Sequence, residues 1–204
     1  LKTFLENPLL LALFITHDGS TSDHGSFGWC IATPSTILWE GSGSTQGRQP
    51  GSFHAESYDM LTALRFLTQY LAYWHVTPAN TALVHKEYTN SKSLLKQLES
   101  SEPIFPLTEG VHGIEFDLKI AIIKTTEALP FQITLLNVHS HQDKKQPNLL
   151  KLKWEAQLNV LGDRFVGWQL KLCKLNLVAT PNPYYNMYIT ANVKSITSHI
   201  RHSM

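Results

Sequence analysis

Asp18 is a carboxylate at the end of an apolar run. It follows the apolar run from Leu11 to Ile15, which lacks the polar alternation of a half-exposed strand and predicts a strand buried on both faces of a sheet. Such a strand brings Asp18 to a sheet edge, where its carboxylate can bind a cation. The simpler alternative is that Asp18 and Gly19 only form a turn.

Glu56 precedes a segment whose apolar residues recur at helical spacing. The predicted buried stripe consists of Met60, Leu61, Leu64, Leu67, Leu71 and Trp74. Glu56 lies one turn before Met60 on the same side, so it should face the sheet, where an ionised group is costly unless it is paired or binds a cation. The alternative places Glu56 in the first turn of the helix, where it only gains from the helix dipole.

Asp163 lies in the last strongly periodic segment, which predicts a terminal helix. Its buried stripe should comprise Trp154, Leu158, Leu161, Phe165, Trp168 and Leu172. Asp163 is on the opposite face, among the small residues Ala156, Val160 and Gly167, and small side chains allow another element to approach closely. Asp163 could thus reach a sheet edge, and the alternative is an ordinary solvated aspartate.

The elements that must position these residues follow from the order of the apolar runs. Alternation over 26–32 and 36–40 predicts two strands after the first, joined by short loops into an antiparallel meander. A helix opens at Ser52, and a fourth strand begins over 81–85 and continues towards Asn90. Because strand, long helix and strand make a parallel crossover, the sheet is mixed.

The second half of the chain supplies the remaining elements. We expect a short helix over 91–99, a loop over 102–113, a fifth strand over 131–135, and the terminal helix. A further helix before the fifth strand should bury Phe116, Ile120, Ile123 and Leu129. The expected fold is α/β, with a five-stranded mixed sheet, three antiparallel strands and then two parallel ones, flanked by helices. Residues 1–172 should form this domain, and residues 173–204 a C-terminal appendage with a small hairpin.

Composition supports one well-buried domain, because the 204 residues are 43% hydrophobic and 16% charged. The charge is uneven: residues 1–130 carry 8 Lys/Arg and 13 Asp/Glu, and residues 131–204 carry 9 and 3. An acidic site beside a basic flank suits a metal-using enzyme of a polyanion, although a random partition of surface charge gives the same asymmetry.

The cysteines and the N-terminus bear on the cellular compartment. Cys30 and Cys173 are far apart without metal-ligand spacing, so we expect two reduced core residues. The apolar run from Leu9 to Ile15 is too short to span a bilayer and lacks the basic flank of an export signal. We therefore expect no membrane insertion, and the function inferred below leads us to expect an intracellular protein, cytoplasmic or nuclear. The first residue, Leu1, suggests a piece of a longer protein.

Taken in order, these residues and elements resemble the type 1 ribonucleases H, particularly the domains of retroelement polyproteins, over about residues 11–172. Asp18-Gly19-Ser20 is similar to the first-strand aspartate motif of that family, and His54-Ala55-Glu56 to its helix glutamate. Ser140-His141-Gln142-Asp143 resembles the family's histidine loop, and Leu161-Gly162-Asp163-Arg164 the setting of its last aspartate. The four motifs occur in the family's order on the expected elements.

The resemblance implies a nuclease that hydrolyses the RNA strand of RNA/DNA hybrids with two Mg²⁺ ions about 4 Å apart, or with Mn²⁺ as a substitute. Asp18 would bridge both ions, Glu56 and position 90 would hold the ion on the leaving-group side, and Asp163 would help to hold the ion that activates water. His141 would assist proton transfer or product release, unless it is an ordinary surface histidine. The candidates for gripping the hybrid are Lys144, Lys145, Lys151 and Lys153. The implied parent is a polyprotein with a reverse transcriptase.

Asn90 is the departure from the family pattern, which places an aspartate at this position. Asn90 belongs either to a natural, decayed domain or to a deliberate substitution that holds substrate without cleaving it. The amide oxygen can still ligate a metal, but one negative charge is lost, so we expect weaker metal binding and much lower turnover. Hybrid binding should suffer less, because phosphates and 2′-hydroxyls carry most of it.

Three functions remain compatible with these residues. The first is an attenuated or inactivated ribonuclease H. The second is a non-catalytic nucleic-acid-binding or structural domain on the same fold. The third is another nuclease or a transposase-like enzyme, because a fold does not fix a function. Retention of Asp18, Glu56 and Asp163 favours an enzyme lineage, and a preference for hybrid over duplex DNA would separate the first function from the third.

Overall fold

The computed structural model describes residues 12–21, 25–45, 51–75, 84–99, 114–174, 189–191 and 194–196. The expected loop over 102–113 and the side chains of Phe116 and Cys173 lie outside the described part of the chain. The proposed boundary between residues 172 and 173 stays a prediction.

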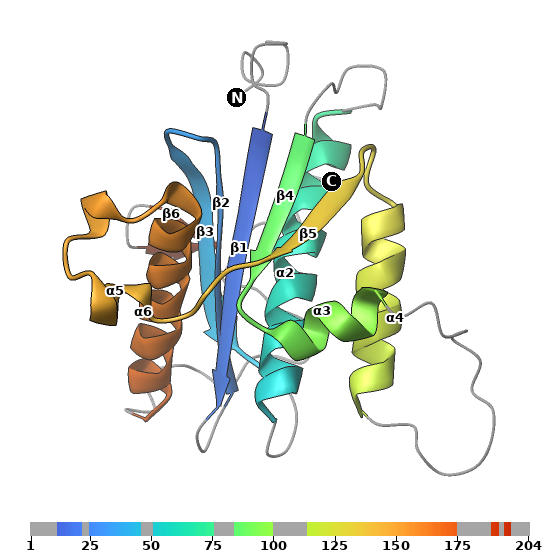
Figure 1. The fold of residues 1–204 in the computed structure, drawn as a ribbon. Helices are drawn as coiled ribbons and strands as arrows, with labels where there is room; N and C mark the ends of the chain where they lie inside the picture. The colour runs from blue at the N-terminus through green and yellow to red at the C-terminus, as the bar shows by residue number, and fades with distance from the viewer. Residues whose placement is uncertain are drawn as a thin grey trace.

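A five-stranded mixed sheet forms the centre of the molecule (Figure 1). Its strands are β1 (Ala12–Thr21), β2 (Gly25–Ala32), β3 (Ile37–Ser44), β4 (Val84–Thr89) and β5 (Ile133–Asn137). They lie in the order β3-β2-β1-β4-β5. The β1–β2 and β2–β3 pairs are antiparallel, whereas β1–β4 and β4–β5 are parallel. The expected strand number and directions are confirmed, and the apolar run at the start of the chain forms the central strand.

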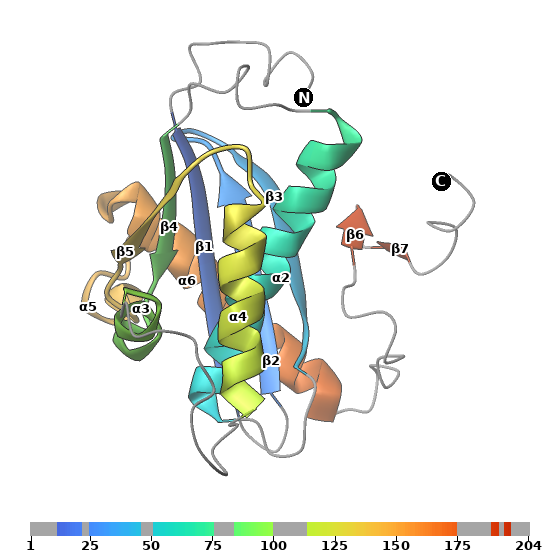
Figure 2. The same ribbon diagram turned by 90° about the vertical axis from the view of Figure 1, so that its right-hand side faces the viewer.

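Helices cover both faces of this sheet (Figures 1 and 2). They are α2 (Ser52–Tyr73), α3 (Lys92–Glu99), α4 (Ile114–Glu127), α5 (Gln142–Lys145), the short 3₁₀ helix η2 (Leu149–Lys151) and α6 (Trp154–Lys174). Helices α2 and α4 lie on one face and α6 lies on the other. Within the described residues, no helix is long and apolar enough to cross a membrane. Two short strands, β6 (Ile189–Ala191) and β7 (Lys194–Ile196), pair antiparallel within residues 173–204, where we expected a small hairpin.

The third strand extends beyond the predicted range 36–40, because it continues through the glycine-rich residues 41–44. Gly41 and Gly43 lie in β3, opposite the bulky side chains of β2. A Cβ atom on Gly41 would lie 2.4 Å from the ring of Trp29, and one on Gly43 would lie 2.6 Å from the ring of Phe27. These glycines therefore make room for core aromatic residues instead of ending the strand.

Helix α2 buries its predicted stripe against the sheet. The side chains of Met60, Leu61, Leu64, Leu67 and Leu71 all belong to the main hydrophobic core. The expectation is wrong for Trp74, which follows the last turn of α2 and is 43% exposed. Glu56 is in the second turn, and the first turn of α2 holds no acidic residue. The helix-dipole alternative for Glu56 therefore fails, because the dipole acts mainly on the first turn.

The buried faces of α6 and α4 differ from the predicted stripes. In α6, Trp168 is 52% exposed and Phe165 is half-buried. The residues that α6 buries include Ala156, Leu158, Asn159, Val160, Gly162, Val166 and Gln169. The small-residue face packs on the sheet because Gly28 of β2 admits the helix closely: a Cβ atom there would lie 2.8 Å from the Cβ atom of Phe165. In α4, Ile122 is buried, whereas Ile120 and Ile123 are half-buried.

Candidate active site

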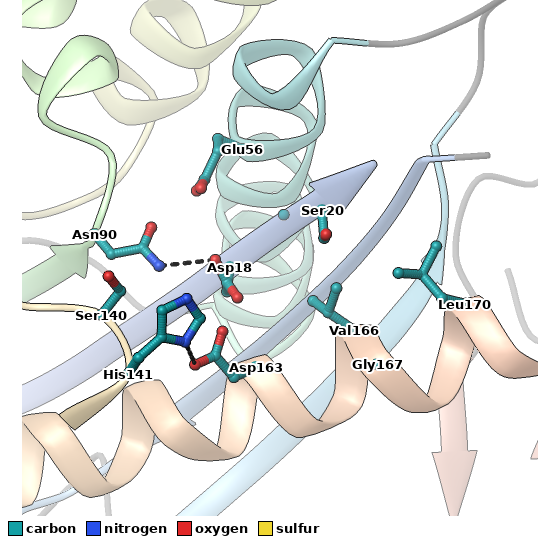
Figure 3. A pocket seen from close by; sticks show the side chains of 11 residues that line it. Asp18, Ser20, Glu56, Asn90, Ser140, His141, Asp163, Val166, Gly167 and Leu170 are labelled. Atoms are coloured by element: carbon teal, nitrogen blue, oxygen red, sulfur yellow. Dashed lines mark hydrogen bonds and ion pairs between the residues drawn. The ribbon is translucent and has the colours of Figure 1, made fainter. Parts of the chain in front are cut away.

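One cavity of about 380 Å³ collects the acidic residues, the amide and the histidine that the sequence singled out. Its lining includes Asp18, Glu56, Asn90, His141 and Asp163. Figure 3 shows their side chains pointing towards one another from β1, α2, the end of β4, the residue before α5, and α6. These elements are distant in sequence, so the tertiary fold alone brings the residues together.

Asp18 and Asn90 are neighbours on adjacent parallel strands. The pairing of β1 with β4 ends at His17 and Thr89, one residue before both of them. The Asn90 side-chain amide donates a hydrogen bond from Nδ2 to Oδ1 of Asp18, at 2.9 Å. β1 does not end at Asp18, as we expected, but continues to Thr21 along β2. The edge that exposes Asp18 is therefore created by the end of β4.

Glu56 reaches the site because α2 passes directly over Gly19. A Cβ atom on Gly19 would lie 2.3 Å from the carbonyl carbon of Ala55 and 2.4 Å from the backbone nitrogen of Glu56. The sequence indicated a turn at Gly19, but the residue lies in β1 and its missing side chain admits the helix. Glu56 is only 9% exposed, and its Oε2 atom is buried without a hydrogen-bond partner.

Asp163 approaches the same cavity from α6. A Cβ atom on Gly162 would lie 3.3 Å from the Gly28 carbonyl oxygen and 3.6 Å from the Asp18 Cβ atom, so the helix rests against Asp18. The side chain of Asp163 is 21% exposed and its Oδ2 atom lies 3.2 Å from Nδ1 of His141. The expectation that the small-residue face carries Asp163 inwards is confirmed.

His141 stands at the mouth of the cavity with its side chain 55% exposed. Its φ angle is 53°, in the left-handed region that residues with a side chain seldom adopt, and it caps the N-terminus of α5. Within the described residues, His75 is the other such case. Strained backbone residues are concentrated at functional sites, which supports a role for the contact between His141 and Asp163.

The electrostatics of the cavity are those of crowded acids. Burial raises the pKa of Asp18 to about 9, helped by a hydrogen bond with Asp163 and by the charges of Glu56 and Asp163, while the Asn90 hydrogen bond lowers it. Burial also raises the pKa of Glu56 to about 8; the Gly19 backbone lowers that pKa and the charge of Asp163 raises it. A cation placed between these carboxyl groups would favour their ionised forms.

The donor set fits a hard divalent cation, because Mg²⁺ prefers carboxylate and amide oxygens. The unpartnered Oε2 of Glu56 is a free ligand atom in this set. Among the described residues, however, no three acidic, histidine or cysteine side chains are close enough together to form a ready-made metal site. A bound cation would offset the repulsion between the ionised carboxylates.

The lysine candidates lie on the segment that leads away from the cavity. Lys144 and Lys145 belong to α5, which immediately follows His141. Lys151 ends η2, and Lys153 precedes α6. All four side chains are exposed, and none of them lines the cavity.

Sequence reasoning missed two apolar residues of the cavity wall, Val166 and Leu170. Both are on α6, three and seven residues after Asp163, which is the spacing of one helix face. This spacing was the signal that could have found them. Together with Gly167 they form the apolar side of an otherwise polar cavity.

Comparison with known proteins finds similar proteins by structure and not by sequence. No family model matches the chain, and no curated protein matches it significantly. Ribonuclease H1 of Halobacterium salinarum aligns with a TM-score of 0.51 and 12% identity, over 78% of this chain and 98% of that one. LC11 ribonuclease H1, solved with an RNA/DNA hybrid, aligns with a TM-score of 0.55 and 14% identity, over 79% of this chain and 99% of that one. The N-terminal ribonuclease H domain of a Mycobacterium tuberculosis protein aligns with a TM-score of 0.55 and 14% identity, over 82% of this chain and 99% of that one.

Proposed function

We propose that this chain, which has a ribonuclease H-like fold, is a nuclease domain for the RNA strand of RNA/DNA hybrids, attenuated by Asn90. The single observation that supports this function best is the convergence of Asp18, Glu56 and Asp163 on one cavity, with Asn90 as the fourth member. An RNA/DNA hybrid occupies LC11 ribonuclease H1, and a substrate of this class would bring its backbone phosphates to the same acids.

Asp18, Glu56, Asp163 and the side-chain oxygen of Asn90 would hold two Mg²⁺ ions, or Mn²⁺ in their place. When bound, such ions activate a water molecule and stabilise the leaving oxygen of a phosphodiester. Asp18 is central because it lies between Asn90 and the helix that carries Asp163. His141, paired with Asp163, can hold a proton at Nδ1 at the mouth of the cavity.

Asn90 limits this site in two ways. Its amide supplies no negative charge, so the ligand set is one charge short of four carboxylates. Its Nδ2 atom is also engaged with Oδ1 of Asp18, and that N–H group occupies an oxygen that a cation would need. We therefore infer weak metal binding and low turnover for the chain as it stands, without loss of the substrate-binding surface.

The exposed lysines supply the proposed grip on the substrate. Lys144, Lys145, Lys151 and Lys153 follow His141 within a short stretch, so a polyanion at the cavity would pass close to them. Phosphate contacts of this kind give affinity and register without reading sequence. We further propose that the domain works within a cell, as part of a polyprotein with a reverse transcriptase.

The decisive experiment compares the chain with its Asn90→Asp variant on a labelled RNA/DNA hybrid in Mg²⁺. We expect cleavage of the RNA strand to rise by orders of magnitude while hybrid affinity changes little, because charge on the metal ligands acts on the transition state. The double variant Asp18→Asn, Asn90→Asp is the control for contaminating nuclease and should be inactive.

Two outcomes would redirect this proposal. Equal and negligible cleavage by both forms, together with no Mg²⁺ binding, would leave the second function, a non-catalytic nucleic-acid-binding or structural domain. Cleavage of duplex DNA with hybrids spared would favour another nuclease or a transposase-like enzyme. The same hybrid and duplex substrates, run side by side, distinguish these cases.

A further inference from the structure

A second polar cluster lies in the core, on the opposite face of the sheet from α6. His17 of β1 stands between Asp59 of α2 and Glu87 of β4, and all three side chains are fully buried. His17 Nδ1 lies 3.9 Å from Asp59 Oδ2. On the other side of the ring, His17 Nε2 lies 3.7 Å from Glu87 Oε1. The imidazole thus faces one acid with each of its nitrogens.

The polar atoms of this cluster lack well-formed hydrogen bonds to the described residues. Both ring nitrogens of His17 and all four carboxyl oxygens of Asp59 and Glu87 are buried without one. Buried polar atoms in folded proteins nearly always have a partner, because an unpartnered one loses its hydration without compensation. Both N···O distances, 3.9 and 3.7 Å, exceed the roughly 3.2 Å upper end of a direct hydrogen bond by about half an ångström or slightly more, so side-chain rotations would have to close both contacts.

The protonation states that burial favours make the cluster complementary. Burial raises the pKa of Glu87 to about 8 and lowers the pKa of His17 to about 3. Burial, followed by the charges of Asp18 and Glu56, also raises the pKa of Asp59 well above its usual range, although the nearby backbone of β1 and β2 partly lowers it. A neutral imidazole can accept a hydrogen bond at Nε2 from the Glu87 carboxyl group and donate one from Nδ1 to Asp59, so the cluster needs no net charge.

The position of the cluster relates it to the cavity. His17 is adjacent to Asp18 in β1. Asp59 lies three residues after Glu56 in α2, and Glu87 lies three residues before Asn90 at the end of β4. Each member therefore belongs to an element that also carries a cavity residue. A contact that fixes β1, α2 and β4 to one another also fixes the spacing of Asp18, Glu56 and Asn90.

We propose that His17, Asp59 and Glu87 form a buried hydrogen-bonded clamp in which His17 is the positioning residue that holds α2 and β4 at the spacing the cation site requires. None of the three touches the cavity; they act through the backbone that carries its ligands. The inference rests on the proposed metal-dependent function, so its test includes a measurement that needs no metal.

Two substitutions of Glu87 isolate the clamp. Glu87→Gln keeps an N–H donor for His17 Nε2, whereas Glu87→Leu has a similar size and no donor; neither side chain ionises. Mg²⁺ affinity is measured by titration of the folded chain, followed through backbone amide resonances. Because residues that orient metal ligands typically contribute 10-fold to 100-fold in affinity, we expect Glu87→Leu to bind Mg²⁺ at least about 10-fold more weakly. Glu87→Gln should stay within about 2-fold of the parent chain.

A core truncation controls for loss of stability. Leu67→Ala removes a buried α2 side chain of the same core, remote from the clamp contacts, and should leave Mg²⁺ affinity nearly unchanged despite a lower melting temperature. If Glu87→Leu does not fold, His17→Gln provides the second disruption, since one amide group cannot bridge acids on opposite sides of the ring. Equal Mg²⁺ affinity for Glu87→Leu and Glu87→Gln would overturn the clamp.

The metal-free measurement is the ¹⁵N resonances of the His17 ring. We expect Nδ1 to carry a slowly exchanging proton and Nε2 to be an unprotonated acceptor, with the Nε2 resonance shifted in Glu87→Leu but not in Glu87→Gln. If the parent chain shows this signature but binds no Mg²⁺, the hydrogen-bonded cluster is supported. The proposed function and the positioning role of His17 are then both refuted. A freely exchanging imidazole in the parent chain would refute the clamp while leaving the proposed function intact.

Discussion

Asn90 shows how much of this site depends on one side-chain atom. Its Nδ2 donates to Oδ1 of Asp18 at 2.9 Å, a contact that a neutral amide can make and an ionised carboxylate cannot. An aspartate at this position would place a second carboxylate against Asp18, beside Glu56 and Asp163. Like charges at that separation destabilise the folded protein unless one group is protonated or a cation lies between them.

The first prediction at this scale concerns stability with and without metal. In a metal-chelating buffer, Asn90→Asp should lower the free energy of unfolding by about 1–3 kcal/mol, because a hydrogen bond to a buried group is replaced by repulsion. Added Mg²⁺ should reverse the loss, by about 2.7 kcal/mol when free Mg²⁺ is 100 times its Kd. Thermal melts with and without Mg²⁺ measure both effects. A variant with the same melting temperature as the parent in both buffers would contradict this account.

The second prediction concerns pH and the acid at position 87. Burial raises the pKa of Glu87 from 4.5 to about 8, so the folded state keeps a proton that the unfolded state has released. The stability from this proton is fully present below pH 4.5 and is lost as the pH rises through about 8. Neutral His17, whose pKa is lowered from 6.5 to about 3, opposes this below pH 6.5, so the window to measure is pH 7 to 9.

Melting temperatures of the parent chain should therefore fall from pH 7 to pH 9, and those of Glu87→Gln should fall less. The other buried acids, Asp18, Glu56 and Asp59, also have raised pKa values and account for the slope that remains. Identical slopes for the two proteins would show that Glu87 is ionised in the folded state at neutral pH.

At the scale of elements, close approach between helices and the sheet decides which side chains reach the cavity. Gly19 admits α2 and Gly28 admits α6, and in both cases a Cβ atom would lie within 3 Å of the helix. These two contacts bring Glu56 and Asp163 to opposite sides of Asp18. The apolar pattern of α6 predicted a different buried face, because its large apolar residues suggest a core-facing stripe more strongly than its small residues do.

The energetic consequence for α6 is testable by truncation. Leu158 is 1% exposed, so Leu158→Ala should cost about 2–5 kcal/mol of unfolding free energy. Phe165 is only half-buried, so Phe165→Ala should cost less than the roughly 3–5 kcal/mol typical of a fully buried phenylalanine. Trp168→Ala is the exposed control and should change stability by less than about 1 kcal/mol. Chemical denaturation of the three variants gives the order, and the reverse order for Leu158 and Phe165 would reject this packing.

At the scale of the whole molecule, exposed lysines lie on the described segment that follows His141 at the mouth of the acidic cavity. Residues 131–204 carry 9 Lys/Arg and 3 Asp/Glu, and four of the lysines are exposed on the segment that follows His141. The acids of the cavity and the lysines beside it would act on the same polyanion, the acids through cations and the lysines directly. Under the proposed function, we therefore expect binding to depend on Asn90 much less than catalysis does.

Salt dependence measures the lysine surface directly. Replacing Lys144, Lys145, Lys151 and Lys153 with glutamine should weaken hybrid binding uniformly across sequences. The slope of log K against log salt should fall by about 1 for each phosphate that a lysine no longer neutralises. Lys124→Gln, at an exposed position on α4, is the control and should keep the parent slope. A quadruple variant with the parent slope would place the substrate on another surface.

The sequence by itself determined the order and directions of the five strands, the buried run of β1 and the identity of the acids, because apolar periodicity and chain order constrain them locally. Only the tertiary structure determined the role of residues whose neighbours in space are distant in the sequence. Gly19 packs against α2 and Gly41 against Trp29. The local sequence does not show these contacts, because the packing partners come from other parts of the chain. The cluster of His17, Asp59 and Glu87 was invisible for the same reason: its members come from three elements, and pairing of distant polar groups leaves no periodic pattern along a chain.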